Sequence, residues 1–259
     1  MERKVLWAEL RRPELEAARD AGAVVVVPVG ATEQHGPHLP VDTDTSSVTE
    51  IALRAARQVE RPPVLVAPTV PYGLSPHHMG FTGTITLRVD TLIDVLVDIC
   101  HSVHAHGFKK IVLLNGHGGN QGLIDAVAVR LVAEQIYVAS LTYWNPIRAD
   151  LREIGRSAEG GMSHACEMET SVQLALRPHL VDMAAAVAAP LVPLTSFFSR
   201  DFRAPGVANY PLDFRRGDHT AGVWGDPTCA TAETGEKVLA VASAKLARFL
   251  REYAAVPEP

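Results

Sequence analysis

Three short stretches of this chain concentrate the side chains that could do chemistry. They cover residues 28–44, 115–120 and 163–171, and their ligand-type side chains are Glu33, His35, His38, Asp42, Asp44, His117, His164, Glu167 and Glu169. The first stretch follows the run Val24–Val27, which is typical of a buried parallel strand. Open α/β sheets bind their ligands at the carboxyl ends of strands, so this position favours a functional site.

This mixture of imidazole and carboxylate groups is typical of a transition-metal site. Zn²⁺, Mn²⁺ and Fe²⁺ accept such a set, whereas Mg²⁺ and Ca²⁺ prefer oxygen ligands alone. Glu33 and His35 are two residues apart, so they point the same way if strand geometry continues. Two metal ions about 3.5–4 Å apart need a bridging carboxylate and can share a hydroxide nucleophile. Five ligand groups with one bridging aspartate would fit such a pair.

Other interpretations of these residues stay open. Residues 115–120 could cradle a phosphate, although they lack the Lys-Ser/Thr ending of a P-loop. His117 could be a satisfied core histidine, and Cys166 could act as a nucleophile beside His164. A dinucleotide-dependent oxidoreductase is disfavoured, because no GxGxxG motif follows an expected strand.

Strands and helices alternate along most of the chain. Hydrophobic periodicity predicts strands over residues 23–29, 64–67, 84–87, 109–114 and 136–142. It predicts helices over residues 8–21, 46–58, 90–106, 121–134, 166–177 and 231–253. This order indicates an α/β fold with a mainly parallel sheet covered on both faces. We find no internal repeat or linker and therefore expect one domain over residues 1–259.

Two stretches show little periodicity and are expected to shape a pocket. They are residues 144–163 and 190–228, and the second is rich in proline, phenylalanine, arginine and glycine. Their aromatic candidates for lining the pocket are Trp144, Phe197, Phe198, Tyr210 and Trp224. Packing in the core or at a subunit contact is an equally good interpretation of these aromatic residues.

The overall composition excludes several classes of function. The net charge of −5 gives no basic surface for nucleic acid. The three cysteines lie far apart, which disfavours a disulfide framework and favours a reducing, cytoplasmic location. The chain has no run of 18 apolar residues and no apolar N-terminal segment, so we expect neither a membrane span nor secretion.

Taken together, the motifs resemble those of the creatininase (creatinine amidohydrolase) family. Residues 30–40 with Asp44, residues 115–120 and residues 164–171 carry the resemblance. Residues 72–86 and 222–227 also look like that family, and the motifs follow the family order over about residues 25–240. The resemblance implies a three-layer αβα sandwich around a mainly parallel sheet. It also implies a binuclear metal centre, which hydrolyses an amide-type C–N bond by a metal-activated hydroxide.

The family pattern assigns roles to individual positions. It implies that Glu33, Asp44 and His117 bind one metal ion, and that His35 and Asp44 bind the second. It makes His164 a catalytic histidine, with Glu167 as a second catalytic candidate. The positions expected to contact substrate are Ser75, His78, Gly118 and Gly119. Zinc is the first expectation for the two ions, with manganese or iron as alternatives, and family members are often hexamers.

Two positions depart from creatininase itself. Gly119 stands where creatininase has a glutamate on the second metal, and Gly160 stands where it has a tryptophan. The missing carboxylate must come from elsewhere, with Glu167 and Glu169 as the candidates. Because they lie roughly 200° apart around a helix, both cannot reach one metal, and the family pattern favours Glu169. The absent tryptophan weakens the case for creatinine as substrate. Other branches of the family, among them deformylases, precursor-peptide peptidases and ring-opening hydrolases, are more similar here.

The sequence thus predicts a metal-dependent amidohydrolase acting on a non-peptide C–N bond of a small cyclic or linear amide. The alternative is a non-hydrolytic metal or small-molecule binding protein, or a metal-dependent lyase or isomerase, on the same fold. We expect no nucleic-acid or membrane partner and a homo-oligomer.

Overall fold

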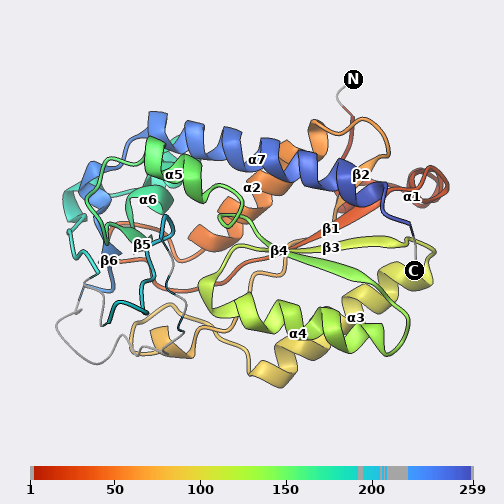
Figure 1. The fold of residues 1–259 in the computed structure, drawn as a ribbon, viewed down its shortest axis with the longest axis horizontal. Helices are drawn as coiled ribbons and strands as arrows, with labels where there is room; N and C mark the ends of the chain where they lie inside the picture. The colour runs from red at the N-terminus through yellow and green to blue at the C-terminus, as the bar shows by residue number, and fades with distance from the viewer. Residues whose placement is uncertain (1–2, 192–194, 205, 207, 209–220, 258–259) are drawn as a thin grey trace.

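The computed structural model describes residues 3–191, 195–204, 206, 208 and 221–257 and has three layers (Figure 1). The middle layer is a parallel sheet with strand order β2-β1-β3-β4. Its strands are β1 (Val24–Val29), β2 (Val64–Val66), β3 (Lys110–Asn115) and β4 (Val138–Thr142). The helix layer on one face comprises α2 (Thr43–Arg57), α5 (Arg148–Ile154), α6 (Glu167–Leu176) and α7 (Ala232–Ala254). The layer on the other face comprises α3 (Val89–Ala105) and α4 (Gln121–Val132).

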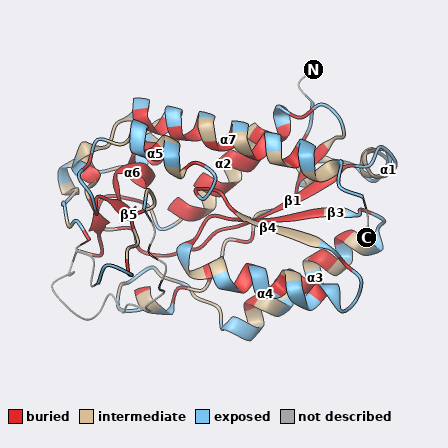
Figure 2. Cartoon of the chain, in the orientation of Figure 1, coloured by how far each residue is buried: buried red, intermediate tan, exposed pale blue. Residues whose placement is uncertain are grey.

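The valine run in β1 packs against both helix layers. Val24 and Val26 belong to the hydrophobic cluster that includes α2 and α7. Val25 and Val27 belong to the cluster that includes α3 and α4. Successive side chains of a strand point to opposite faces, so a strand covered on both sides must be apolar at every position. Figure 2 shows this continuous burial, and the predicted αβα sandwich is confirmed.

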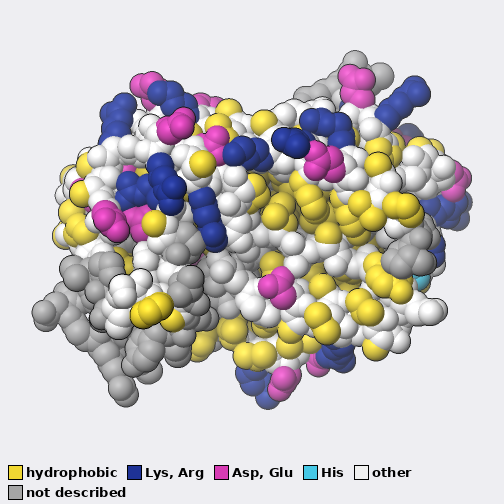
Figure 3. Space-filling view, in the orientation of Figure 1, with side chains coloured by type: hydrophobic (Ala, Val, Ile, Leu, Met, Phe, Trp, Pro, Cys, Tyr) yellow, Lys and Arg dark blue, Asp and Glu magenta, His cyan; other side chains and the backbone are white. Residues whose placement is uncertain are grey.

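The outer faces of α5 and α7 are largely polar. On the face drawn in Figure 3, basic and acidic side chains are mixed over the helix layer of α5 and α7. The inward positions of α7 are buried and mostly apolar, as expected for an amphipathic helix. None of the helices in the described parts of the chain is both long and apolar enough to cross a membrane.

The register of the sheet brings two functional loops together. Val29 at the end of β1 pairs with Asn115 at the end of β3, and Asn115 pairs with Thr142 at the end of β4. The loops that follow β1 and β3 therefore leave the sheet side by side. These loops carry Glu33 and His117.

Several predicted elements differ from those observed. The expected strand over residues 84–87 is wrong: Ile85 and Thr86 form only isolated bridges. The irregular stretch 144–163 contains α5, and its end forms β5 (Met162–His164), which pairs antiparallel with β6 (Trp224–Gly225). Near the N-terminus the helix is shorter than expected, α1 (Arg12–Asp20). Helix α2 begins at Thr43 rather than residue 46, so Asp44 lies in its first turn. The expectation of one domain stays a prediction.

Gly235 is expected to be essential for the contact between α6 and α7. A Cβ atom at this position would collide with the backbone carbonyl of Ser171 in α6. Overpacking of this kind costs about 1–3 kcal/mol, so Gly235→Ala should lower the free energy of unfolding by about that amount. Urea denaturation measures it. Gly122→Ala in α4 is the matched control, because its Cβ would meet nothing within 4 Å. Equal stabilities of the two variants would contradict this prediction.

Candidate metal centre

The five side chains predicted to bind metal converge beyond the carboxyl end of the sheet. Asp44 lies between two histidines, with Oδ1 3.2 Å from His35 Nε2 and Oδ2 2.9 Å from His117 Nδ1. Glu33 Oε1 is 3.3 Å from His117 Nδ1, and Glu169 Oε2 is 3.9 Å from His35 Nε2. All five side chains are buried. The central position of Asp44 is the one that a bridging ligand would take.

Two of the carboxylates are held at the first turns of helices. Asp44 belongs to the first turn of α2, and Glu169 to the first turn of α6. The positive end of the helix dipole stabilises a carboxylate there. The hydroxyl of Thr45 donates to the carbonyl of Ala31 at 2.9 Å, which ties the start of α2 to the loop after β1. Rigid elements thus place both carboxylates.

Backbone carbonyls fix the orientation of three histidine rings. The contacts are His35 Nδ1 to Glu33 O (3.1 Å), His117 Nε2 to Leu74 O (3.1 Å) and His164 Nε2 to Gln34 O (2.9 Å). A carbonyl oxygen only accepts, so His35 Nδ1 and His117 Nε2 each carry a hydrogen, whereas His164 Nε2 also lies 3.0 Å from the amide nitrogen of Gln34. When the His35 and His117 rings are neutral, as in a metal complex, their opposite nitrogens direct lone pairs at carboxylates. Metal-binding histidines are typically held in this way, because a cation between the two electron-rich groups removes their repulsion.

Unsatisfied polar atoms gather at the same place. Among the described residues, Glu33 Oε2, His35 Nε2 and Asp44 Oδ2 are buried and make no hydrogen bond of good geometry. A buried polar atom without a partner costs about 1–3 kcal/mol, so three in one cluster fit a site that binds a cation. The nitrogen and carboxylate donors also lie in overlapping groups within 4.8 Å of one another. This donor set fits zinc, manganese or iron.

The buried carboxylates favour protonation of two histidines of the cluster. Burial alone would lower the pKa of His35, but the carboxylates of Asp44 and Glu169 outweigh it and raise that pKa to about 10. Burial likewise opposes the charge on His117, yet Glu33 and Asp44 raise its pKa well above the usual value. Burial raises the pKa of Glu169 to about 7, against the opposing charge of His35. Metal binding must therefore displace protons from this cluster.

Gln34 contacts both His78 and His164, and sequence spacing gave no signal for it. Its Oε1 accepts from the Gly36 N–H at 2.9 Å, so its amide Nε2 is the donor to His78 Nδ1, also at 2.9 Å. The other nitrogen of His78 consequently carries hydrogen and lies 3.4 Å from Glu33 Oε1. His78 therefore supports the Glu33 carboxylate, although it also lines the cavity described below.

Two residues predicted to act at the site lie behind it. Ser75 is fully buried, with Oγ 3.3 Å from His117 Nε2, and it orients that ring without lining the cavity. The carboxylate of Glu167 accepts the backbone N–H groups of Arg156 and Ser157, each at 2.8 Å. Because Glu167 is turned toward that loop, it lies neither in the metal-binding groups nor in the cavity wall, and its expected catalytic role stays a prediction that this geometry does not support.

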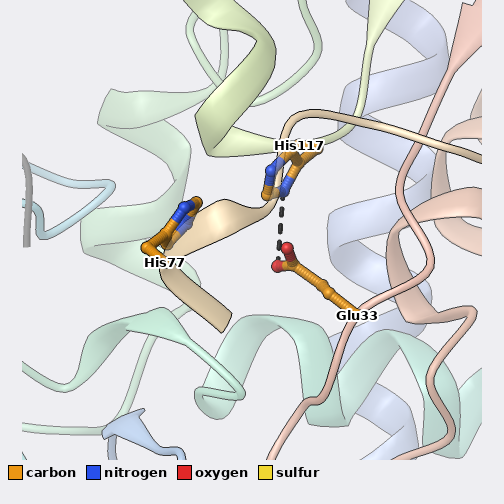
Figure 4. A group of neighbouring side chains, drawn as sticks. All are labelled: Glu33, His77 and His117. Atoms are coloured by element: carbon orange, nitrogen blue, oxygen red, sulfur yellow. Dashed lines mark ion pairs between the residues drawn. The ribbon is translucent and has the colours of Figure 1, made fainter. Parts of the chain in front are cut away.

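His77 joins the site although the sequence analysis did not select it. Its ring stacks on His117 with centroids 5.9 Å apart, and it forms one possible metal-binding group with His117 and Glu33 (Figure 4). Burial is the main cause that lowers the pKa of His77, to about 4. Its position directly before His78 was the one available signal.

Gly119 is expected to be required for the orientation of His117. A Cβ at Gly119 would collide with the carbonyl of Leu74, the group that fixes the His117 ring. Gly119→Ala should weaken metal binding by about 10–100-fold, the usual cost of losing such a partner. Metal titration of the purified protein checks this. Gly118→Ala, with nothing within 4 Å of its Cβ, should keep its metal affinity and melting temperature. An equal loss in both variants would contradict the prediction.

The cluster opens into a cavity of about 470 Å³. His164, Gly118 and Gly119 line it, as do Arg148 and Arg200. Of the aromatic candidates, those in the wall are Trp144, Phe198 and Trp224. Phe197 is exposed and outside the wall, and Tyr210 lies outside the described residues. The cavity has the size of a site for a small organic molecule.

Comparison with known proteins identifies relatives along nearly the whole chain. The family profile for creatininase (creatinine amidohydrolase) matches residues 8–250. A mycofactocin precursor peptide peptidase from Mycolicibacterium smegmatis is 37% identical over 220 residues, which cover 84% of this chain and 80% of the relative. A creatinine amidohydrolase from Pseudomonas putida is 31% identical over 269 residues, which cover 97% of this chain and 98% of the relative.

A solved structure shares the fold. A structure described as manganese creatininase superposes with a TM-score of 0.81 at 30% identity, covering 98% of this chain and all of that one. The likeness thus extends to the sheet, both helix layers and the loops that carry the cluster.

Proposed function

Because this chain belongs to the creatinine amidohydrolase family, we propose that it is a metal-dependent hydrolase that cleaves an amide C–N bond. One metal ion would be held by Glu33, Asp44 and His117. The other would be held by His35, Asp44 and Glu169. The observation that carries this proposal is the set of imidazole rings anchored by backbone carbonyls, whose opposite nitrogens face buried carboxylates.

The chain's own residues would position and move protons. A divalent ion pair, when bound, lowers the pKa of water and polarises a carbonyl oxygen. His164 lines the cavity, and its Nδ1 faces Glu33 Oε1 at 3.6 Å. Burial, reinforced by the charge of His35, lowers the pKa of His164, so its ring is neutral near pH 7. His164 Nδ1 can accept a proton from the attacking water and pass it to the leaving nitrogen.

Gly118 and Gly119 would assist at the substrate carbonyl. Both line the cavity beside His117. Glycine permits close approach of a backbone, and backbone N–H groups stabilise a developing oxyanion.

A linear amide is the substrate class that we favour. The similarity to a precursor peptide peptidase supports a peptide-type bond, so the bond need not be non-peptide as the sequence alone predicted. Gly160, in place of the tryptophan of creatininase, supports a substrate other than creatinine. Small cyclic amides and formamides are the second candidate. We also propose a cytoplasmic homo-oligomer, with a hexamer as the family precedent.

A substrate screen tests the proposed function. The metal-free protein is loaded in turn with Zn²⁺, Mn²⁺ and Fe²⁺ and assayed for release of amine or formate from short peptides, formamides and lactams. We expect chelator-sensitive hydrolysis of one class. Stoichiometric metal binding without turnover on any amide would favour the non-hydrolytic alternative.

A further inference from the structure

Two arginines from separate elements lie in the wall of the metal-site cavity. Arg148 is the first residue of α5, and Arg200 belongs to the described segment 195–204. Neither is needed to build the carboxylate and histidine cluster. Both border the space that a substrate would occupy.

Arg148 has a donor that nothing in the described chain uses. Its Nη2 donates to Asn145 Oδ1 at 2.6 Å. Its Nε is buried and has no hydrogen-bond partner among the described residues. Those residues also place no carboxylate in ion-pair range of Arg148. A guanidinium group presents Nε and Nη as a planar fork that matches the two oxygens of a carboxylate or phosphate.

Arg200 adds a second positive charge to the wall. Its Cζ lies 5.8 Å from the ring centroids of both Phe198 and Trp224. The adjacent Asp201 pairs with Arg203 at 2.6 Å and accepts the Gly160 N–H at 2.9 Å. The Asp201 carboxylate is therefore paired with Arg203.

The charge balance of the cavity favours an anion. Glu33, Asp44 and Glu169 are the carboxylates of the cluster in the cavity wall. These three carboxylates together with one hydroxide would balance the charge of two divalent ions, so the guanidinium of Arg148 would leave the wall with a net positive charge. Such a site attracts an anionic ligand and disfavours a cationic one.

We propose that Arg148, assisted by Arg200, binds an anionic group of the substrate, a carboxylate or a phosphate, while the amide bond lies at the metal cluster. This assignment rests on the proposed function and specifies its substrate class. Arg148 is the specificity-determining residue, because it lines the cavity and its Nε has no hydrogen-bond partner among the described residues.

Matched inhibitors test the proposal by direct binding. Succinic monohydroxamic acid carries a carboxylate, its terminal amide carries none, and 3-phosphonopropionohydroxamic acid carries a phosphonate. Calorimetry on the metal-loaded protein gives their dissociation constants, and metal analysis accompanies each titration. We expect an anionic probe to bind about tenfold or more tightly than the amide. The tighter of the two anionic probes identifies carboxylate or phosphate as the natural group.

Variants of Arg148 test whether this residue causes the preference for the anionic probe over the amide. Arg148→Gln should reduce binding of the anionic probe to the level of the amide and leave the amide unchanged. Arg148→Lys should restore part of the preference, because it keeps the charge but loses the fork. The exposed Arg152→Gln in the same helix is the control and should behave like wild type. Equal binding of charged and neutral probes in wild type, or a preference that survives Arg148→Gln, overturns the proposal.

A separate arm distinguishes this proposal from the proposed function. Succinate and succinamide carry no hydroxamate, so their comparison reports the anion site alone. If every hydroxamate fails to bind, the metal-dependent function is contradicted. A preference for succinate that Arg148→Gln abolishes would then still support the arginine site, and its absence would refute it.

Discussion

The Asp44→Asn protein should lose both metal ions and nearly all hydrolytic activity while remaining folded. One oxygen of Asp44 faces His35 and the other faces His117, so this side chain is shared by both proposed metal positions. Asparagine keeps the shape but removes the negative charge that a bridging ligand supplies. The loss of activity should exceed the ~10–100-fold that removal of an outer partner of a metal site costs.

Metal content per protein, circular dichroism and the rate of amide hydrolysis measure the result. Glu50→Gln is the matched control on the same helix, because Glu50 pairs with Arg54 at 2.7 Å, away from the cluster. It should retain both ions and the wild-type rate. Full metal occupancy in Asp44→Asn would exclude Asp44 as the bridging ligand.

Exchanging Glu169 for glutamine should remove one metal ion and most of the activity, whereas the same change at Glu167 should leave the metal content intact. Glu169 faces His35 at 3.9 Å, in the position that a ligand of the second ion needs. Glu167 instead accepts backbone N–H groups of Arg156 and Ser157. Weakening those bonds should lower the free energy of unfolding by about 1–2 kcal/mol.

Each of the two variants is the control for the other, since both residues are buried glutamates in the first turn of α6. Metal analysis and urea denaturation of both proteins give the comparison. The opposite pattern, with metal lost from Glu167→Gln and stability lost from Glu169→Gln, would reverse the assignment of the fifth ligand.

Much of the fold followed from local pattern. The valine run 24–27 predicted β1 correctly, because apolar side chains at successive positions suit only a strand covered on both faces. The predicted strand over residues 84–87 is wrong, because alternation of threonine with apolar residues satisfies strand propensity but provides no neighbouring strand to pair with. Helix α5, within residues 144–163, was not predicted, because a helix of seven residues is too short to show a clear hydrophobic period.

For the candidate site, too, the sequence determined some features and the tertiary structure determined the others. Sequence alone determined which residues could bind metal, because Glu33, His35 and His117 lie in loops directly after strands. It could not find the roles of Gln34 or Arg148, since hydrogen bonds and cavity walls join residues far apart in the chain. It narrowed the fifth ligand to Glu167 or Glu169, because two positions in one helix turn point to different sides. Only the packing of α6 against α2 and α7 decided which side of α6 faces the cluster, and that packing depends on contacts that no local spacing contains.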